Sequence, residues 1–498
     1  MPHILISIDR NKGAKRIMNH KMLRYMLGKM MGVEALLLLF PAFVGLIYKE
    51  KEALSFVLVS FILLVIFLIF GLKKPENTTI YGKEGFFIAG MSWILWAIFG
   101  AIPFTITGCI PFYVDAVFET ISGFTTTGST ILNDIEVLPN CMNFWRCLTH
   151  WVGGMGVLVF VMMVTSLGEK NSMHLMRAEM PGPEASKLVP KAKSTARILY
   201  IMYLVLTVVE VIFLLFGGMN LFDAIIHSFS TAGTGGFSNR NASIAYYDSA
   251  YIDAVITIFM VLFGVNFNLY YFAIMGNIKE LFKNEELRVY IGIIASSVVL
   301  ISINILGQYG TITKAVRYAS FQVGAIITTT GFCTANYELW PEFSKCILLL
   351  IMVIGACAGS TGGGIKISRL VIMLKSIKRE IQKMIHPQSV SIVKLNDKKV
   401  SEQTINSVYI YFICYVFILM FSVLIVSFDN KDFATNFSGV LTALSNVGPG
   451  ISKLAPVENF SSFSPLSKFV FCADMLIGRL EIFPYLLLFS TSFGKKKF

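Results

Sequence analysis

The sequence predicts an all-α membrane protein with ten transmembrane helices. Of the 498 residues, 55% are hydrophobic and only 14% are charged, and the mean hydropathy is +0.68. A water-soluble chain with one core per domain does not reach so apolar a balance. Two further observations refine the class. A motif recurs four times on one side of the predicted spans, and most Lys and Arg residues fall on the other side.

The ten spans are segments long and apolar enough to cross the hydrocarbon layer, which takes about 20 residues of helix. They lie near residues 31–48, 53–72, 84–103, 143–167, 196–217, 250–275, 287–306, 344–374, 405–428 and 466–491. The basic N-terminal segment lacks a short apolar core followed by a small-residue cleavage site. We therefore expect no removable signal peptide.

The basic balance of the chain reflects its membrane topology. The formal net charge is +12, from 42 Lys and Arg against 30 Asp and Glu. With the N-terminus inside, the ten spans leave most Lys and Arg in inner segments, as the positive-inside rule requires. We expect a multi-pass protein in the lipid bilayer with both termini in the cytoplasm, and no binding to nucleic acid.

The eight cysteines form no Cys-x-x-Cys pair. Cys109, Cys141 and Cys333 fall on the outer side, so pairing among them stays open, although buried free thiols are favoured.

Four outward loops each carry a short, semi-apolar stretch that ends in a turn rich in Thr and Gly. These stretches are too short to span the membrane, which favours re-entrant helices. The turns, called the filter turns below, contain Thr125–Ser129, Thr234–Phe237, Thr329–Phe332 and Asn446–Gly450. Their glycines recur about every hundred residues, at Gly128, Gly236, Gly331 and Gly448.

The repeat extends upstream of these glycines. Asp115 and Asp223 stand at the same distance before their glycines, and a small or hydroxyl residue stands six before each, at Ser122, Ser230, Ala325 and Thr442. Each unit therefore reads as span, re-entrant helix, turn and span, and the first two spans stand outside the repeat. The predicted divisions are 1–80, then pore units 81–194, 195–284, 285–400 and 401–498.

Backbone turns at membrane depth survive only where protein buries them or where they line water, so four of them imply one shared aqueous path. Re-entrant helices aim their negative C-terminal ends at a cation there. Backbone carbonyls then replace the hydration shell of potassium, and glycine permits the conformation that this requires. The predicted filter residues are Thr126, Thr127, Gly128, Thr234, Gly235, Gly236, Thr329, Thr330, Gly331, Asn446, Val447 and Gly448. The turns carry no ring of Asp or Glu, which argues against a carboxylate filter for calcium or sodium.

Over nearly its whole length the chain resembles the Trk/Ktr/HKT superfamily of potassium transporters, and specifically its TrkH branch. The resemblance rests on the four turns and on three further motifs: His150–Gly156, Gly359–Lys366 and Gly478–Glu481. The two extra N-terminal spans also fit the TrkH branch better than the Ktr type. One departure is the second turn, which is richer in glycine than the others.

The resemblance implies a potassium uptake protein of the cytoplasmic (inner) membrane of a prokaryote. It implies a fourfold pseudosymmetric pore within one chain, a homodimer, and a cytosolic nucleotide-binding regulatory subunit of the TrkA type. Potassium is then the transported substrate, and no cofactor and no enzymatic activity are expected. The alternative left open is a symporter that couples potassium to sodium or protons, for which Glu210 in the apolar span 196–217 is the main candidate.

The span near 344–374 contains five glycines between Gly355 and Lys366, so it cannot remain one helix and should form an intramembrane loop. A P-loop is excluded because Ile365 separates Gly364 from Lys366 and no strand precedes it. A passive kink stays open, but the resemblance implies a gate beneath the filter. The gate residues are Gly355, Gly359, Ser360, Thr361, Gly362, Gly363, Gly364, Lys366 and Arg479.

Two other side chains stand out. His150 has no other histidine at a metal-ligand spacing, so a packing or interfacial role is expected. Arg479 is a permanent charge in an apolar run and should face the pore or a buried partner. The resemblance implies that it forms an electrostatic barrier below the filter; a structural salt bridge is the alternative.

Overall fold

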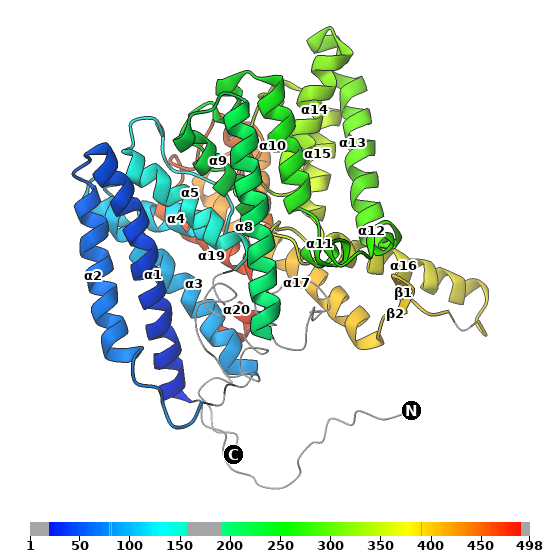
Figure 1. Cartoon of the computed structure of the whole chain (residues 1–498). Coiled ribbons are helices and arrows are strands. Elements are labelled where there is room, and N and C mark those ends of the chain that lie inside the picture. The colour runs from blue at the N-terminus through cyan, green and yellow to red at the C-terminus, as the bar shows by residue number, and fades with distance from the viewer. Residues whose placement is uncertain (1–18, 79, 81, 157–191, 390, 490–498) are drawn as a thin grey trace.

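The computed structural model describes residues 19–78, 80, 82–156, 192–389 and 391–489, and there the chain is almost entirely helical (Figure 1). Helices α1 (His20–Tyr48) and α2 (Ala53–Phe70) stand side by side at one edge of the molecule. The Ser60 hydroxyl of α2 donates to the Ala35 carbonyl of α1 at 2.7 Å. Both helices also pack against α3 (Gly82–Ile106).

After α2, the same order of elements occurs in four successive segments: a long apolar helix, a short helix, a filter turn and a further helix. The long helices are α3, α8 (Ala192–Phe216), α13 (Glu285–Tyr309) and α17 (Glu402–Val426). The short helices are α4 (Tyr113–Phe124), α9 (Leu221–Gly233), α14 (Ile312–Ile327) and α18 (Phe433–Ser445). The helices after the turns are α5 (Asn140–Gly154), α10 (Ala250–Phe263), α15 (Glu342–Ile354) and α19 (Pro465–Arg479).

The helix after each filter turn packs against the short helix of the next segment. Helix α5 contacts α9, α10 contacts α14, α15 contacts α18, and α19 contacts α4. Ion pairs reinforce two of these contacts, between Arg317 and Asp253 at 2.7 Å and between Lys468 and Asp115 at 2.7 Å. Because α19 returns to α4, the contacts close a ring around the four turns.

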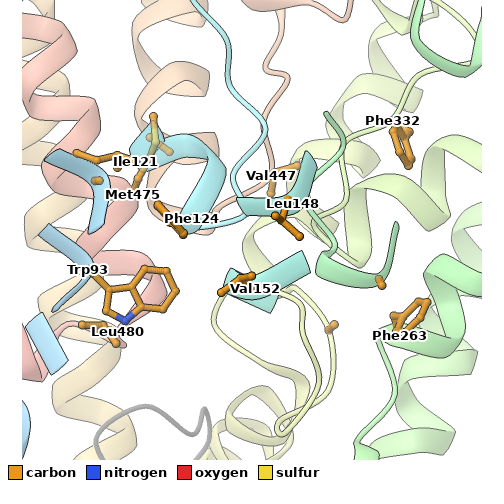
Figure 2. Close-up of a cluster of buried hydrophobic side chains, with 14 of the residues drawn as sticks. Trp93, Ile121, Phe124, Leu148, Val152, Phe263, Phe332, Val447, Met475 and Leu480 are labelled. Carbon is orange, nitrogen blue, oxygen red and sulfur yellow. The ribbon is translucent and has the colours of Figure 1, made fainter. Parts of the chain in front are cut away.

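Large apolar side chains fill the space between the segments. Figure 2 shows Trp93, Phe124, Met475 and Leu480 gathered from α3, α4 and the end of α19. Each is at most 2% exposed, and burial of a side chain of this size contributes about 1.5–3 kcal/mol. This cluster fixes the first and fourth segments against each other close to the first filter turn.

Among the described residues, six helices are long and apolar enough to cross a membrane, or seven if one bent pair counts as one span. The six are α1, α2 and the four long helices. The predicted span near 250–275 is not one straight helix, because α10 ends at Phe263 and α11 (Phe267–Ile274) leaves at an angle of 92°. The side chain of Asn266 caps α11 by accepting from the Asn268 N–H at 3.0 Å, which stabilises the break.

The predicted span near 466–491 is also interrupted. Helix α19 ends at Arg479, Glu481 and Ile482 adopt positive φ values of 57° and 66°, and α20 (Phe483–Phe489) follows. The break predicted between Gly355 and Lys366 is present, since α15 ends at Ile354 and α16 (Ile367–Ile385) begins beyond it. For the span near 143–167, α5 ends at Gly154, and residues 157–167 lie outside the described part of the chain.

The remaining elements are short. They are α12 (Ile278–Lys283), the 3-10 helices η1 (Ser243–Tyr247), η2 (Tyr337–Leu339), η3 (Ser427–Asp429) and η4 (Ser452–Leu454), and the antiparallel strands β1 (Lys394–Leu395) and β2 (Lys398–Lys399). The strands lie beside α16, away from the filter turns (Figure 1). All eight cysteines are free thiols, so the outer cysteines do not pair.

Candidate ion filter and gate

Each short helix ends in the same hydrogen-bonded turn. The backbone N–H one residue before each glycine donates to the carbonyl of the small residue that the sequence repeat aligned. These bonds are Thr127 to Ser122 (2.9 Å), Gly235 to Ser230 (2.9 Å), Thr330 to Ala325 (2.8 Å) and Val447 to Thr442 (3.0 Å). A second bond, from the preceding N–H to the carbonyl three residues earlier, completes a Schellman motif in all four turns.

The filter turns hold unusual backbone conformations. The residue two before each glycine is left-handed, with φ of 54° at Thr126, 54° at Thr234, 61° at Thr329 and 55° at Asn446. For a β-branched threonine this conformation is an outlier that persists only where the surroundings impose it. The glycines follow with φ from 77° to 102°. The same strained conformation recurs four times, at the residues predicted to line the filter.

The four glycines pack against one another's turns in a closed ring. A Cβ added at Gly128 would overlap the Gly235 carbonyl oxygen, one at Gly236 the Thr330 oxygen, and one at Gly331 the Val447 oxygen. A Cβ at Gly448 would lie 2.7 Å from the Thr127 oxygen, back in the first turn. In every case the neighbour is the carbonyl just before the next glycine. The predicted filter residues are thus brought together, although they lie about a hundred residues apart along the chain.

Side-chain hydrogen bonds brace the turns. Thr125 and Thr127 share a hydroxyl bond of 2.8 Å, and Thr328 and Thr330 share one of 2.7 Å at the same position in the third turn. The Asn446 amide donates to the Thr127 hydroxyl at 2.9 Å, which ties the fourth turn to the first.

His150 explains the glycine-rich second turn. Its ring stacks on Phe237 with 4.1 Å between the ring centroids, and its Nδ1 accepts from the Phe237 N–H at 3.4 Å. A Cβ at Gly233 would overlap the His150 carbonyl, and one at Gly235 would overlap the His150 ring. The packing role predicted for His150 is confirmed, and the two extra glycines make room for it.

The intramembrane loop, residues 355–366, lies directly against the third and fourth filter turns. The Gly363 N–H donates to the Thr329 hydroxyl at 2.6 Å, and the Gly364 N–H donates to the Ser445 carbonyl at 3.0 Å. The break after α10 frees a carbonyl for the loop, because Gly264 accepts from the Cys357 N–H at 3.1 Å. The loop that carries all the predicted gate residues except Arg479 therefore packs against the third and fourth filter turns.

A buried carboxylate that sequence reasoning missed anchors this loop. Glu286 of α13 accepts from the N–H groups of Ala358 at 2.7 Å and Ser368 at 3.1 Å, so it holds both the loop and the first turn of α16. The Lys366 ammonium folds back and donates to the Gly362 carbonyl. Only its place in an apolar helix, near a basic inner segment, marks Glu286 in the sequence.

Arg479 of the fourth segment lies below the filter turns and hydrogen-bonds both the first and the third segment. Its guanidinium donates to the carbonyls of Thr361 at 2.8 Å, Gly153 at 2.5 Å and Gly154 at 2.7 Å. It lines a cavity of about 50 Å³ together with Lys366 and several loop glycines. Two residues further on, Glu481 pairs with both terminal nitrogens of Arg369, at 3.2 and 2.5 Å.

Glu210 is fully buried in α8, but other acidic side chains in the helices are buried to the same degree. Glu34 in α1 and Asp474 in α19 are also at most 1% exposed, and Asp474 accepts from the Ser422 hydroxyl at 2.8 Å. Within the described residues, no three His, Cys, Asp or Glu side chains lie close enough to hold a metal ion.

Comparison with known proteins decides the family. A family model described as "TrkH: Cation transport protein" matches residues 54–498. The chain belongs to the TrkH family. The Trk system potassium uptake protein TrkH of Escherichia coli K12 is 35% identical to this TrkH-family chain over 465 residues, covering 92% of this chain and 96% of the relative. The protein of the same description from Halomonas elongata is 35% identical over 419 residues, covering 83% and 86%.

A solved structure agrees with this membership. The crystal structure of the potassium transporter TrkH from Vibrio parahaemolyticus matches this TrkH-family chain with a TM-score of 0.87 at 30% identity. The match covers 96% of this chain and 100% of that one. The helical architecture that carries the filter turns is therefore that of a known TrkH protein.

Proposed function

We propose that this TrkH-family protein takes up potassium through one central pore, whose selectivity filter is the ring of four filter turns. The observation that carries the proposal is the ring itself, in which each glycine packs against the carbonyl that precedes the next glycine. The four segments are then pseudo-repeated pore units, 81–194, 195–284, 285–400 and 401–498, around that pore. The Escherichia coli and Vibrio relatives, described as a potassium uptake protein and a potassium transporter, support the choice of ion.

The chemistry of uptake follows from the turns. Carbonyl oxygens replace water around a dehydrated potassium ion, and the C-terminal ends of α4, α9, α14 and α18 add about half a negative charge each near the same point. The membrane potential then draws the cation inward with ~2.3 kcal/mol per 100 mV. Uptake in this scheme is channel-like and requires no second ion.

The intramembrane loop is proposed as the gate, with Arg479 as an electrostatic barrier beneath the filter. The loop's contacts to Thr329 and Ser445 support this position, since a loop in that place obstructs the path below the filter. We further propose that the protein is a homodimer in a bacterial inner membrane, with both termini in the cytoplasm. A cytosolic nucleotide-binding subunit of the TrkA type would act on the loop through α16.

Rubidium uptake into proteoliposomes of purified protein tests the function. We expect uptake driven by an inside-negative potential, competed by potassium and weakly by sodium, and unaltered by an imposed pH or sodium gradient. Protein-free liposomes are the control. Uptake that requires one of the gradients would identify an ion-coupled symporter instead, and the absence of rubidium uptake would contradict potassium transport.

A further inference from the structure

The residues that follow each filter glycine need hydrogen-bond partners outside the turn itself. These outer limbs, residues 129–131, 237–239, 332–335 and 449–451, form no helix or strand. Buried backbone groups require hydrogen-bond partners, and a strained turn persists only when its surroundings impose it. The Schellman bonds hold the inner side of each turn, so the outer side must be held by other groups.

A polar side chain stands nine residues before the glycine in three of the four turns: Glu119, His227 and Gln322. All three are at most 1% exposed, although they differ in chemistry. Each lies on a short helix and hydrogen-bonds the outer limb of its own turn.

In the first turn, the Glu119 carboxylate accepts from the Thr130 hydroxyl at 3.0 Å and from the Ile131 N–H at 3.1 Å. Arg146 neutralises the carboxylate through an Nε bond of 2.8 Å. The same guanidinium donates to the Ser238 carbonyl at 3.2 Å, in the second outer limb. This ion pair therefore links two adjacent limbs.

In the second turn, His227 contacts the Asp223 carbonyl through Nδ1 at 2.7 Å and the Ser238 hydroxyl through Nε2 at 2.9 Å. Because a carbonyl only accepts, Nδ1 carries the proton in the neutral ring and Nε2 accepts from Ser238. The imidazole thus ties the helix α9 backbone to the second outer limb.

In the third turn, the Gln322 amide oxygen accepts from the N–H groups of Thr334 at 2.9 Å and Ala335 at 3.3 Å, in the amide orientation that satisfies both groups. The fourth turn has Gly439 at the same register, where a Cβ would lie 2.7 Å from the Leu454 side chain. One residue earlier, the Ser438 hydroxyl accepts from the Ile451 N–H at 3.1 Å.

We propose that Glu119, His227, Gln322 and Ser438 are positioning residues that hold the outer limbs and thereby preserve the carbonyl spacing on which potassium selectivity depends. The selectivity part of this inference rests on the proposed potassium pore. A carbonyl cage whose limbs relax loses its discrimination between ions of different size. The four side chains are struts behind the filter and do not contact the ion.

The sharpest test is Gln322→Met, because it removes a neutral strut at similar volume. A change at Glu119 would also leave Arg146 as an unpaired buried charge and destabilise the fold for another reason. Gln308→Met is the matched control, since Gln308 donates to the Leu339 carbonyl at 2.9 Å on the exposed surface. Gln322→His keeps a neutral acceptor and should rescue, because histidine occupies this register in the second turn.

Two measurements on these variants test the proposal. Hydrogen-exchange mass spectrometry should show faster exchange of the amides of residues 332–335 in Gln322→Met, while Gln308→Met and Gln322→His match wild type there. The permeability ratio of rubidium to sodium should fall by at least about threefold in Gln322→Met, the scale of one lost buried hydrogen bond.

Unchanged exchange in the 332–335 limb would overturn the strut assignment, whether or not the protein transports potassium. A loosened limb with an unaltered permeability ratio would overturn its role in selectivity. Failure of wild type to take up rubidium would contradict the proposed function alone, because the exchange measurement would still decide the strut.

Discussion

The guanidinium of Arg479 donates to the Thr361 carbonyl at 2.8 Å, and this bond joins the fourth segment of the chain to the intramembrane loop. The same side chain reaches Gly153 and Gly154 at the end of α5. The Arg479 side chain, which is permanently charged, thus connects the first and third segments below the filter turns. In the proposed pore, a cation that leaves the filter inward would meet this charge.

Arg479→Ala should increase the single-channel conductance about two- to tenfold, since a unit charge about 4 Å from a cation in a water-filled path contributes about 1 kcal/mol, which is about fivefold in rate. The preference for potassium over sodium should stay nearly unaltered, because the filter turns remain intact. Arg479→Lys should resemble wild type, because it keeps the charge. Planar-bilayer recording of purified protein measures both quantities.

Arg288→Ala is the matched control for this prediction, because it removes an exposed arginine near the N-terminal end of α13. A folded Arg479→Ala protein with equal or lower conductance would contradict the barrier and leave Arg479 as a tie between segments.

Glu481→Gln should raise the open probability in the absence of any partner protein. Arg369 stands just beyond the intramembrane loop, and its bidentate pair with Glu481 holds the start of α16 against the break after α19. Loss of the carboxylate charge weakens this partly buried pair and so favours movement of the loop. The charge-swapped double variant Arg369→Glu/Glu481→Arg should restore a low open probability.

Glu402→Gln serves as the control for the ion pair, because it breaks the exposed pair with Arg379 at 2.6 Å. An open probability that stays at the wild-type value in Glu481→Gln would show that the pair does not restrain the gate.

Gly128→Ser should raise sodium permeation relative to potassium. Gly128 has a φ of 80°, and a Cβ there would overlap the Gly235 carbonyl, so the second turn must shift to accept it. Gly218→Ser isolates this effect, since Gly218 has a φ of 88° with no atom within 4 Å of an added Cβ. Relative permeabilities from reversal potentials decide the matter; equal ratios in wild type and Gly128→Ser would refute the proposed register.

Deletion of Ser360–Gly363 should increase potassium flux. The deleted residues include the Thr361 carbonyl that binds Arg479 and the Gly363 N–H that binds the Thr329 hydroxyl. Without these residues the loop is too short to lie below the third turn and obstruct the proposed path. Rubidium uptake at equal membrane expression is the measurement, and lower uptake than wild type would favour a passive kink over a gate.

Much of the architecture could be predicted from the sequence, because it follows from local properties of the chain. Apolar composition indicated a membrane protein, and the glycines at 128, 236, 331 and 448 indicated four equivalent turns, since positive φ is a requirement of each turn alone. The break between Gly355 and Lys366 was predictable for the same reason: a helix cannot continue through five glycines in twelve residues.

The tertiary structure alone decided which of these local features meet. The contact of Gly128 with Gly235, the anchoring of Ala358 by Glu286, the pairing of Arg369 with Glu481 and the struts behind the filter all join residues whose partners no local pattern specifies. The breaks at Gly264 and Leu480 also escaped prediction. The carbonyls freed at Phe263 and Gly264 are satisfied by Thr361 and Cys357 of another segment, and the break at Leu480 needs positive φ at Glu481 and Ile482, which are not glycines. The sequence by itself therefore determined a membrane chain with four glycine turns and a broken helix. The tertiary contacts among the four segments determined how the turns and the loop are assembled. Only packing between distant segments supplies the hydrogen bonds and ion pairs that hold a strained backbone in place.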